Sequence, residues 1–192
     1  MHLVDRSFKE LVAMTAKTPP ELGGSTAALL SSLLGIAMSK MAFLTSVKKH
    51  FDNDLIVARL DAIAMDIASA LERDQKSVKQ LINSLKDDAA PQVKRSALIE
   101  ATRQPLAASH LLIDAMEVLV SARGKVDQSV TSDYYGGAAV LAASFRAVVM
   151  ATDANLEATS LAEIKQRTSH ARSELQARFE RATEKLGLLS RE

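Results

Sequence analysis

Apolar residues recur along most of this chain at steps of three and four residues, the spacing of one face of an α-helix. The pattern predicts a short helix after Ser7 and longer helices over about 25–47, 53–86, 92–123, 133–156 and 161–186. Polar breaks that contain Pro or Gly separate several of these segments. We therefore expect an all-α fold, a single-domain antiparallel helical bundle of about six helices spanning residues 1–192.

Helix starts carry capping signals. Ser7 and Ser160 are each followed three residues later by Glu, which predicts two capping boxes. Ser25 or Gly24 is the expected cap of the second helix, and Ser132 or Asp133 that of the fifth. In the first helix the expected inward stripe consists of Phe8, Leu11, Val12 and Thr15.

The segment 25–47 is apolar on nearly every side, so two explanations compete. Its length would span a bilayer. Lys40 and several serines lie within it, however, and a lysine is costly in lipid. We therefore expect a central buried helix, covered by its own subunit and in part by a dimer partner.

The third helix contains the most informative single residue. Its apolar stripe is interrupted once, by Asp74; the stripe consists of Ile56, Leu60, Ile63, Ile67, Ala70, Asp74, Val78, Leu81 and Leu85. A carboxylate on an inward stripe is costly unless it is paired or reached by water. Asp74 is therefore either a functional carboxylate or a structural one held by a salt bridge or by water.

Other features also leave two interpretations open. Residues 18–24 form a Pro/Gly loop before a helix start, which is either an anion or polar-ligand cradle or simply a turn. Tyr134 and Tyr135 at a helix start either form a wall for a flat ligand or pack into a groove. Pro105 must kink or divide the fourth helix and free a backbone carbonyl one turn earlier.

Composition narrows the function classes. The formal net charge of +1 gives no overall field for nucleic acid or an anionic membrane surface. Cysteine is absent, which excludes disulfides and thiolate chemistry, and the four histidines lack metal-ligand spacing, so we expect no metal. The first residues do not have the pattern of a signal peptide, so we expect a cytoplasmic protein. No phosphate loop, dinucleotide fingerprint or nucleophile elbow appears.

Several blocks in shared order resemble the formiminotransferase-cyclodeaminase C-terminal domain family, which includes methenyltetrahydrofolate cyclohydrolases. The match runs from Phe8 to about Leu156. The matching blocks are the Gly-Gly-Ser turn and Ala-rich helix of 20–29, Ser39–Thr45, Lys48-Lys49-His50-Phe51, Asp74–Val78, Glu100-Ala101-Thr102-Arg103-Gln104-Pro105-Leu106, Ser132-Asp133, Arg146 and Asn155-Leu156.

This resemblance implies an all-helical homodimer that binds a tetrahydrofolate derivative as its substrate. Such an enzyme hydrolyses 5,10-methenyltetrahydrofolate to 10-formyltetrahydrofolate, or cyclises 5-formiminotetrahydrofolate with loss of ammonia. Asp74 would shuttle the proton. Lys48, Lys49 and His50 would attract the glutamate tail, Gly23, Gly24 and Ser25 would offer backbone donors, and Asp133 with Tyr134 would contact the pterin.

Several positions depart from the family pattern. Glu21 and Leu22 replace a proline and a glycine of the first turn, and Phe43 and Ala151 each replace an asparagine. These departures leave open which reaction dominates, whether folate activity persists and which ligand is used. The alternative hypothesis is a divergent member with another ligand, or a non-catalytic binding or assembly subunit.

Overall fold

The computed structural model describes residues 2–18, 21–86 and 89–188. Within these ranges the chain is helical and contains no strand, so the predicted all-α class is confirmed. The helices are α1 (Phe8–Thr15), α2 (Gly24–Val47), α3 (Asp54–Lys86), α4 (Pro91–Ala122), α5 (Thr131–Leu156) and α6 (Ala162–Lys185). Short 3-10 turns occur at Leu3–Asp5, Arg123–Lys125, Gln128–Val130 and Thr159–Leu161.

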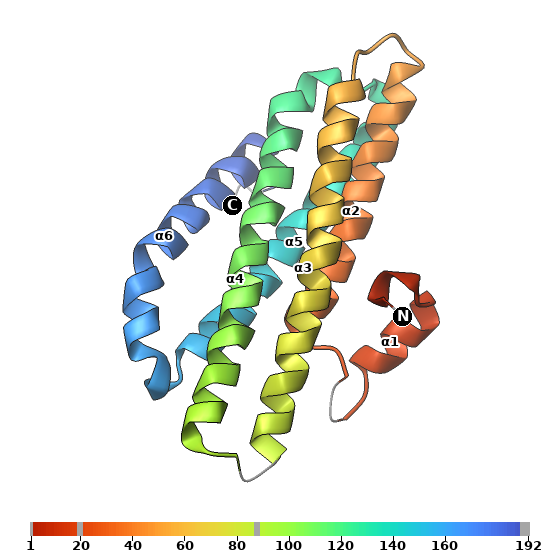
Figure 1. Ribbon diagram of the computed structural model, residues 1–192. Coiled ribbons are helices and arrows are strands. Elements are labelled where there is room, and N and C mark those ends of the chain that lie inside the picture. The colour runs from red at the N-terminus through yellow and green to blue at the C-terminus, as the bar shows by residue number, and fades with distance from the viewer. Residues whose placement is uncertain (1, 19–20, 87–88, 189–192) are drawn as a thin grey trace.

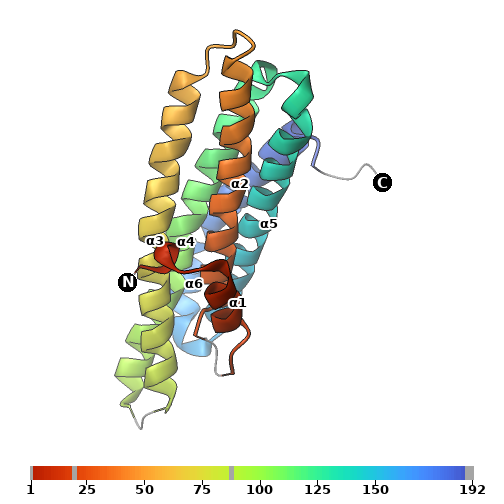
Figure 2. The ribbon, with the colours of Figure 1, turned by 90° about the vertical axis from the view of Figure 1, so that its right-hand side faces the viewer.

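The four long helices α2 to α5 run up and down beside one another (Figure 1). Helix α2 packs most extensively against α5 and also contacts α3 and α4, but it leaves Leu34, Met41 and Leu44 exposed. Helix α6 lies outside the bundle against α4 and α5, whereas α1 lies at the beginning of α2 (Figures 1 and 2).

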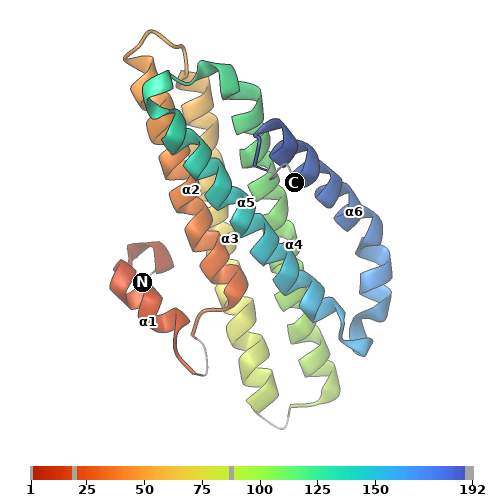
Figure 3. The same cartoon turned by 180° about the vertical axis from the view of Figure 1, so that it is seen from behind.

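Helices α2 and α5 lie side by side (Figure 3), and small residues face each other at their contact. A Cβ atom added to Gly137 would lie 2.3 Å from Ser39 Oγ and 2.5 Å from the Gly35 carbonyl oxygen. A Cβ atom on Gly35 would lie 2.9 Å from the Gly137 carbonyl oxygen. Glycine is required at this crossing because any side chain would push the two backbones apart.

The predicted stripe of α3 is buried from Leu60 to Asp74 but turns outward near its end, where Leu85 is 64% exposed and Ser84 is buried instead. A spacing of 3.5 residues drifts by about 20° per heptad relative to a straight helix. Over the four heptads of α3 this drift carries the last stripe residues away from the core.

Only one of the four predicted N-caps is observed. Ser7 forms the complete capping box with Glu10, as predicted. The other three predictions are wrong: the N-caps are Gly23 for α2, Val130 for α5 and Leu161 for α6, and none of them makes a side-chain capping bond.

The predicted inward stripe of α1 is also wrong for the single chain. Phe8 is 74% exposed and Val12 is exposed as well, whereas Met14 is the buried side chain of this helix. Helix α1 has only the first half of α2 beside it, so its apolar stripe has no bundle to enter.

Helix α4 continues through Pro105 without being divided. Proline has no N–H, so the carbonyl of Ala101, four residues earlier, loses its helical partner. The Asn155 side-chain amide donates to that carbonyl at 3.0 Å. Asn155 therefore ties the end of α5 to the one place where the α4 hydrogen-bond ladder is open.

Three segments are long and apolar enough to cross a membrane, judged by length and composition alone: Gly24–Val47, Pro91–Lys125 and Gln128–Leu156. Helix α3 runs alongside α2 and exposes Arg59, Asp66 and Arg73 along its length. A span through these helices would place those charges in hydrocarbon, where they are costly. This arrangement supports the bundle explanation of the apolar helices.

Candidate functional site

Asp74 faces the beginning of α2 from the middle of α3, and its side chain is 0% exposed. The hydroxyls of Ser25 and Thr26 donate to the same carboxyl oxygen, Oδ2, at 2.8 and 2.6 Å. The Asp74 carbonyl accepts a further bond from the Ser77 hydroxyl at 2.8 Å. The first turn of α2 therefore fixes the carboxyl from one side.

The second carboxyl oxygen, Asp74 Oδ1, is buried and has no hydrogen-bond partner among the described residues. Burial raises the pKa of Asp74 above its usual value, although the hydrogen bonds from Thr26 and Ser25 act in the opposite direction. No cation within the described ranges forms an ion pair with it. The arrangement raises the proton affinity of the carboxyl and leaves Oδ1 as the oxygen that can gain or lose a proton.

Gly23 and Gly24 lie beside this carboxyl at the start of α2. Gly23 is the N-cap, and a Cβ atom there would lie 3.1 Å from Val78 Cγ2 on α3, so the glycine allows the two helices to approach. Ser25 uses its hydroxyl for Asp74 rather than for capping. Gly23, Gly24, Ser25 and Asp74 thus form one group, which we call the Asp74 cluster.

The remaining predicted residues lie at the opposite end of α2. Lys48 is the C-cap of α2, and Lys49 and His50 follow it in a turn in which His50 has a φ of 71°. We call Lys48, Lys49 and His50 the basic turn. Because 24 helical residues rise about 36 Å, one chain does not bring the basic turn to the Asp74 cluster.

The beginning of α5 lies next to the basic turn. The backbone N–H of Asp127, just before α5, donates to Ser46 Oγ on α2 at 2.8 Å. Hydrogen bonds from Ser129 hold the pKa of Asp127 below its usual value, and the nearby charge of Lys49 lowers it further. Asp133, in the first turn of α5, is therefore near the basic turn and far from Asp74.

Tyr134 is packed rather than presented to a ligand. Its ring is buried and meets Phe43 edge-on at 5.8 Å, and its hydroxyl donates to the Leu119 carbonyl at 2.7 Å. Burial raises the pKa of this hydroxyl far above its usual value. Of the two interpretations of Tyr134, the structure shows the one in which the ring packs into a groove. Contact with a pterin would require the Tyr134 side chain to leave this packing.

Two residues with clear roles were not singled out as site residues from the sequence. Thr26 binds Asp74 as closely as Ser25 does, yet it is one of many hydroxyl residues in α2 and carries no distinguishing signal. Asn155 was recognised only as part of a matching block. The freed carbonyl expected before Pro105 was the signal that a donor was needed there.

Glu100, the first residue of the Glu100–Leu106 block, lines a second feature of the surface. It borders a groove of about 760 Å³ between the end of α3 and the start of α4, together with Gln80, Asn83 and Gln92. Its carboxylate accepts from Arg103 and Gln104, and these bonds hold its pKa below the usual value. Among the described residues, no group of three or more His, Cys, Asp or Glu side chains is placed to hold a metal ion.

Comparisons with known proteins agree with this architecture. The fold matches the crystal structure of formiminotetrahydrofolate cyclodeaminase from Thermotoga maritima with a TM-score of 0.87, 17% sequence identity and coverage of 96% of both chains. A comparison with curated protein sequences gives no match. The family model described as formiminotransferase-cyclodeaminase matches residues 6–174, which is most of the sequence. This chain therefore belongs to the formiminotransferase-cyclodeaminase family.

Proposed function

We propose that this protein is a folate-dependent one-carbon enzyme that makes or opens the methenyl bridge between N5 and N10 of tetrahydrofolate. The observation that carries the proposal is the state of Asp74, which is buried, is held by two hydroxyls through one oxygen and has no partner on the other. A carboxyl with a raised pKa can act as a general acid and base near neutral pH. Family membership supports the folate as the small-molecule substrate.

Both reactions of the proposal pass through a tetrahedral carbon and need proton transfers on the oxygen and nitrogen atoms bonded to it. In the hydrolase direction, water adds to the methenyl carbon, one water proton is released, and the other passes to N5 as the bond from that carbon to N5 breaks to give the 10-formyl product. In the cyclodeaminase direction, N10 attacks the formimino carbon and gives up its proton, the former imino nitrogen gains two protons, and its bond to the carbon breaks so that it leaves as ammonia. Asp74 Oδ1 would transfer the proton in either case, with the protein acting in the cytoplasm and without a metal.

The roles of the other predicted residues remain part of the proposal. Gly24 and Ser25 would direct first-turn N–H groups of α2 at the substrate beside Asp74, and Gly23 would keep the turn narrow. Lys48, Lys49 and His50 would attract the carboxylates of the glutamate tail. Asp133 would bind the pterin edge. These two sets lie at opposite ends of α2, so the complete site requires two chains, and the protein would work as a homodimer.

The test follows the absorbance of methenyltetrahydrofolate with purified protein, and in parallel measures ammonia released from 5-formiminotetrahydrofolate. We expect the wild type to accelerate one of these reactions and Asp74→Asn to lower the rate by about 10²- to 10⁴-fold, the usual contribution of a general acid. An unchanged rate in Asp74→Asn would remove Asp74 from the mechanism. Wild-type rates equal to buffer in both assays would refute the enzyme proposal.

A non-catalytic relative is the second candidate, and the complete burial of Asp74 favours it. A carboxyl closed off from solvent must be reached through local opening before it can act. A folate that binds the wild type without being converted would establish this alternative. Binding measured by fluorescence titration, run beside the two rate assays, separates the candidates.

A further inference from the structure

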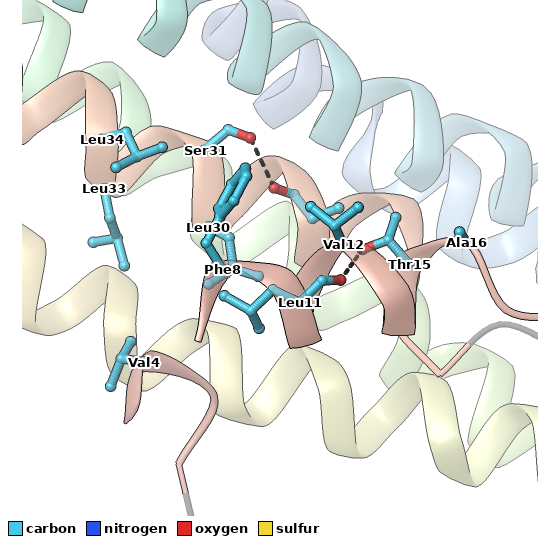
Figure 4. A pocket seen from close by; sticks show the side chains of 11 residues that line it. Val4, Phe8, Leu11, Val12, Thr15, Ala16, Leu30, Ser31, Leu33 and Leu34 are labelled. Carbon is cyan, nitrogen blue, oxygen red and sulfur yellow. Dashed lines mark hydrogen bonds between the residues drawn. The ribbon is translucent and has the colours of Figure 1, made fainter. Parts of the chain in front are cut away.

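Most hydroxyl side chains of α2 bond to their own helix. Ser31, Ser39 and Ser46 each donate to the carbonyl four residues earlier. Ser32 donates to the carbonyl three residues earlier. Figure 4 shows this local bond for Ser31 and also for Thr15 on α1. Because a hydroxyl has a single proton, one that bonds to its own helix donates to no other group.

Thr26 and Ser25 differ from these residues because they lie in the first turn of α2. The helix begins at Gly24, so the carbonyls three and four positions before these two residues lie outside it. Both hydroxyls donate to Asp74 Oδ2 instead, at 2.6 Å from Thr26 and 2.8 Å from Ser25. Their place in the first turn frees the two protons without determining which group accepts them.

Thr26 is the more enclosed of the two donors. Its side chain is 0% exposed, whereas that of Ser25 is 4% exposed. The branched Cβ atom of a threonine restricts the rotation of its side chain within a helix. The Thr26 hydroxyl is therefore held in its direction toward Asp74.

The two donors bond to one oxygen only, which makes the Asp74 carboxyl asymmetric. An oxygen of this kind has two lone pairs, and on Oδ2 the two hydroxyl protons use both of them. A proton on Oδ2 would displace one donor. A proton on Oδ1 displaces none, because Oδ1 has no partner among the described residues. The neutral acid therefore carries its proton on Oδ1.

We propose that Thr26 is a positioning residue of the reaction: its hydroxyl, with that of Ser25 as the second donor, keeps Oδ2 occupied and confines the transferred proton to Asp74 Oδ1. This inference rests on the folate function proposed above and adds the residue that determines which carboxyl oxygen reacts. Thr26 acts through Asp74 and does not touch the substrate.

Hydrogen bonds rather than charges hold Asp74. Several charged side chains on α3 and on the elements packed against it are paired with one another within the described ranges: Lys40 with Asp61, Arg103 with Glu100, and His2 beside Glu72. Arg73, next to Asp74 in the sequence, is exposed on the outer side of α3. Burial raises the pKa of Asp74 and the bonds from Thr26 and Ser25 lower it, so loss of the Thr26 donor should raise this pKa further.

The protonation of Asp74 can be followed without a substrate. In protein that carries ¹³C-labelled aspartate, the carboxyl signal of Asp74 is identified by its loss in Asp74→Asn. Thr26→Val keeps the shape of the side chain and removes the donor, so the midpoint of this signal should move to higher pH by about one unit, the contribution of one hydrogen bond to a charged group. Thr26→Ser keeps the donor and should titrate near the wild type.

Thr183→Val is the matched control. Thr183 is 1% exposed on α6, and its hydroxyl donates to the Phe179 carbonyl of its own helix at 2.9 Å. The same change of side chain there should leave the titration of Asp74 where it is. An unmoved midpoint in Thr26→Val, or an equal movement in Thr183→Val, would overturn the proposal.

Ser25→Ala provides a second variant that does not depend on the folding of Thr26→Val. It removes the other hydroxyl and keeps the backbone N–H of residue 25. The midpoint of Asp74 should move in the same direction, because Oδ2 again loses one donor. A midpoint that stays in place in Ser25→Ala would contradict the joint action of the two hydroxyls.

Turnover tests the positioning role itself. Thr26→Val should lower kcat by about 10- to 10²-fold, because the proton is no longer confined to one oxygen, and should leave KM unchanged. The limb of the pH–rate profile that reports Asp74 should move to higher pH together with the carboxyl signal. Thr26→Ser should restore kcat. If Thr26 only filled space, Thr26→Ser would be the more damaging change, because it removes the buried methyl group that Thr26→Val keeps.

The two measurements separate this inference from the function on which it rests. A wild type that converts neither folate removes the proposed function, and the ¹³C titration then decides alone whether Thr26 controls Asp74. An active wild type, with a shifted Asp74 signal but an unchanged kcat in Thr26→Val, would refute the positioning role and leave the folate function intact.

Discussion

Asp74 is held in a state that favours its neutral form, and this should be visible in the stability of the protein. Burial raises its pKa in the folded chain above that in the unfolded chain, so the folded state binds the proton more tightly. Stability is then fully present in acid and is lost as the pH rises from the usual aspartate range through the raised pKa. Asp74→Asn is neutral at every pH, so near neutrality its free energy of unfolding should exceed that of the wild type.

Urea unfolding of both proteins over a range from acid to neutral pH measures this effect. The stability difference between Asp74→Asn and the wild type should grow as the pH rises. Asp66→Asn, on the exposed side of α3, serves as the control and should follow the wild-type profile. Parallel pH profiles for Asp74→Asn and the wild type would show that the buried carboxyl is already ionised at no cost.

The sequence alone identifies Asp74 but not the residues that bind its carboxyl group. Asp74 is visible because it interrupts an apolar stripe, and its polar character conflicts with its position. Ser25 and Thr26 are brought to it by the packing of α2 on α3, across 49 and 48 positions of sequence. No local pattern encodes such a contact, because hydroxyl residues are common along α2.

Among the elements, the existence of each helix follows from periodicity, whereas its first residue often does not. The cap at Ser7 is satisfied locally by Glu10, so its sequence signal is reliable. Ser25 is followed three residues later by Ala28 and not by Glu, so it lacks the reciprocal partner that Ser7 has. Helix α2 begins earlier than predicted, after Gly23, and the Ser25 hydroxyl donates to Asp74 instead.

The contact between α2 and α5 should not tolerate larger side chains at its glycines. In Gly137→Ala the new methyl group would meet Ser39 Oγ and the Gly35 carbonyl far inside contact distance, so the two backbones must separate. We expect a loss of about 1–3 kcal/mol in the free energy of unfolding, typical of overpacking, despite the better helix propensity of alanine. Urea titration measures it.

The matched control is Gly124→Ala, where nothing lies within 4 Å of the added Cβ atom. This variant should unfold within about 0.5 kcal/mol of the wild type, as do most surface substitutions. Equal stability of the two glycine variants would mean that α2 and α5 are packed more loosely than the structure shows.

For the molecule as a whole, the sequence places the predicted site residues in one pocket, and the fold divides them. Gly23, Gly24 and Ser25 of the Asp74 cluster lie at one end of α2 and the basic turn lies at the other end, so the helix holds the two groups apart. The apolar stripe of α1 was likewise expected inside the chain, because periodicity identifies an apolar face but not what covers it. The proposed homodimer would account for both discrepancies, because a second chain would cover the apolar faces and supply the distant residues.

The proposed homodimer predicts that thermal unfolding depends on protein concentration. If dissociation accompanies unfolding, raising the concentration roughly 100-fold stabilises the dimer by about 2.7 kcal/mol, the mass-action value for a ligand at the same excess. Two chains of 192 residues unfold with an entropy that converts this into a rise in Tm of about 3 °C. Leu34 is 58% exposed on α2, so Leu34→Glu would place a charge where the second chain is expected and should abolish the concentration dependence, whereas Met65→Glu on α3 should preserve it. Calorimetric scans of the three proteins at low and high concentration decide the matter, and a wild-type Tm that stays constant would mean that the exposed face of α2 is not closed by a second copy.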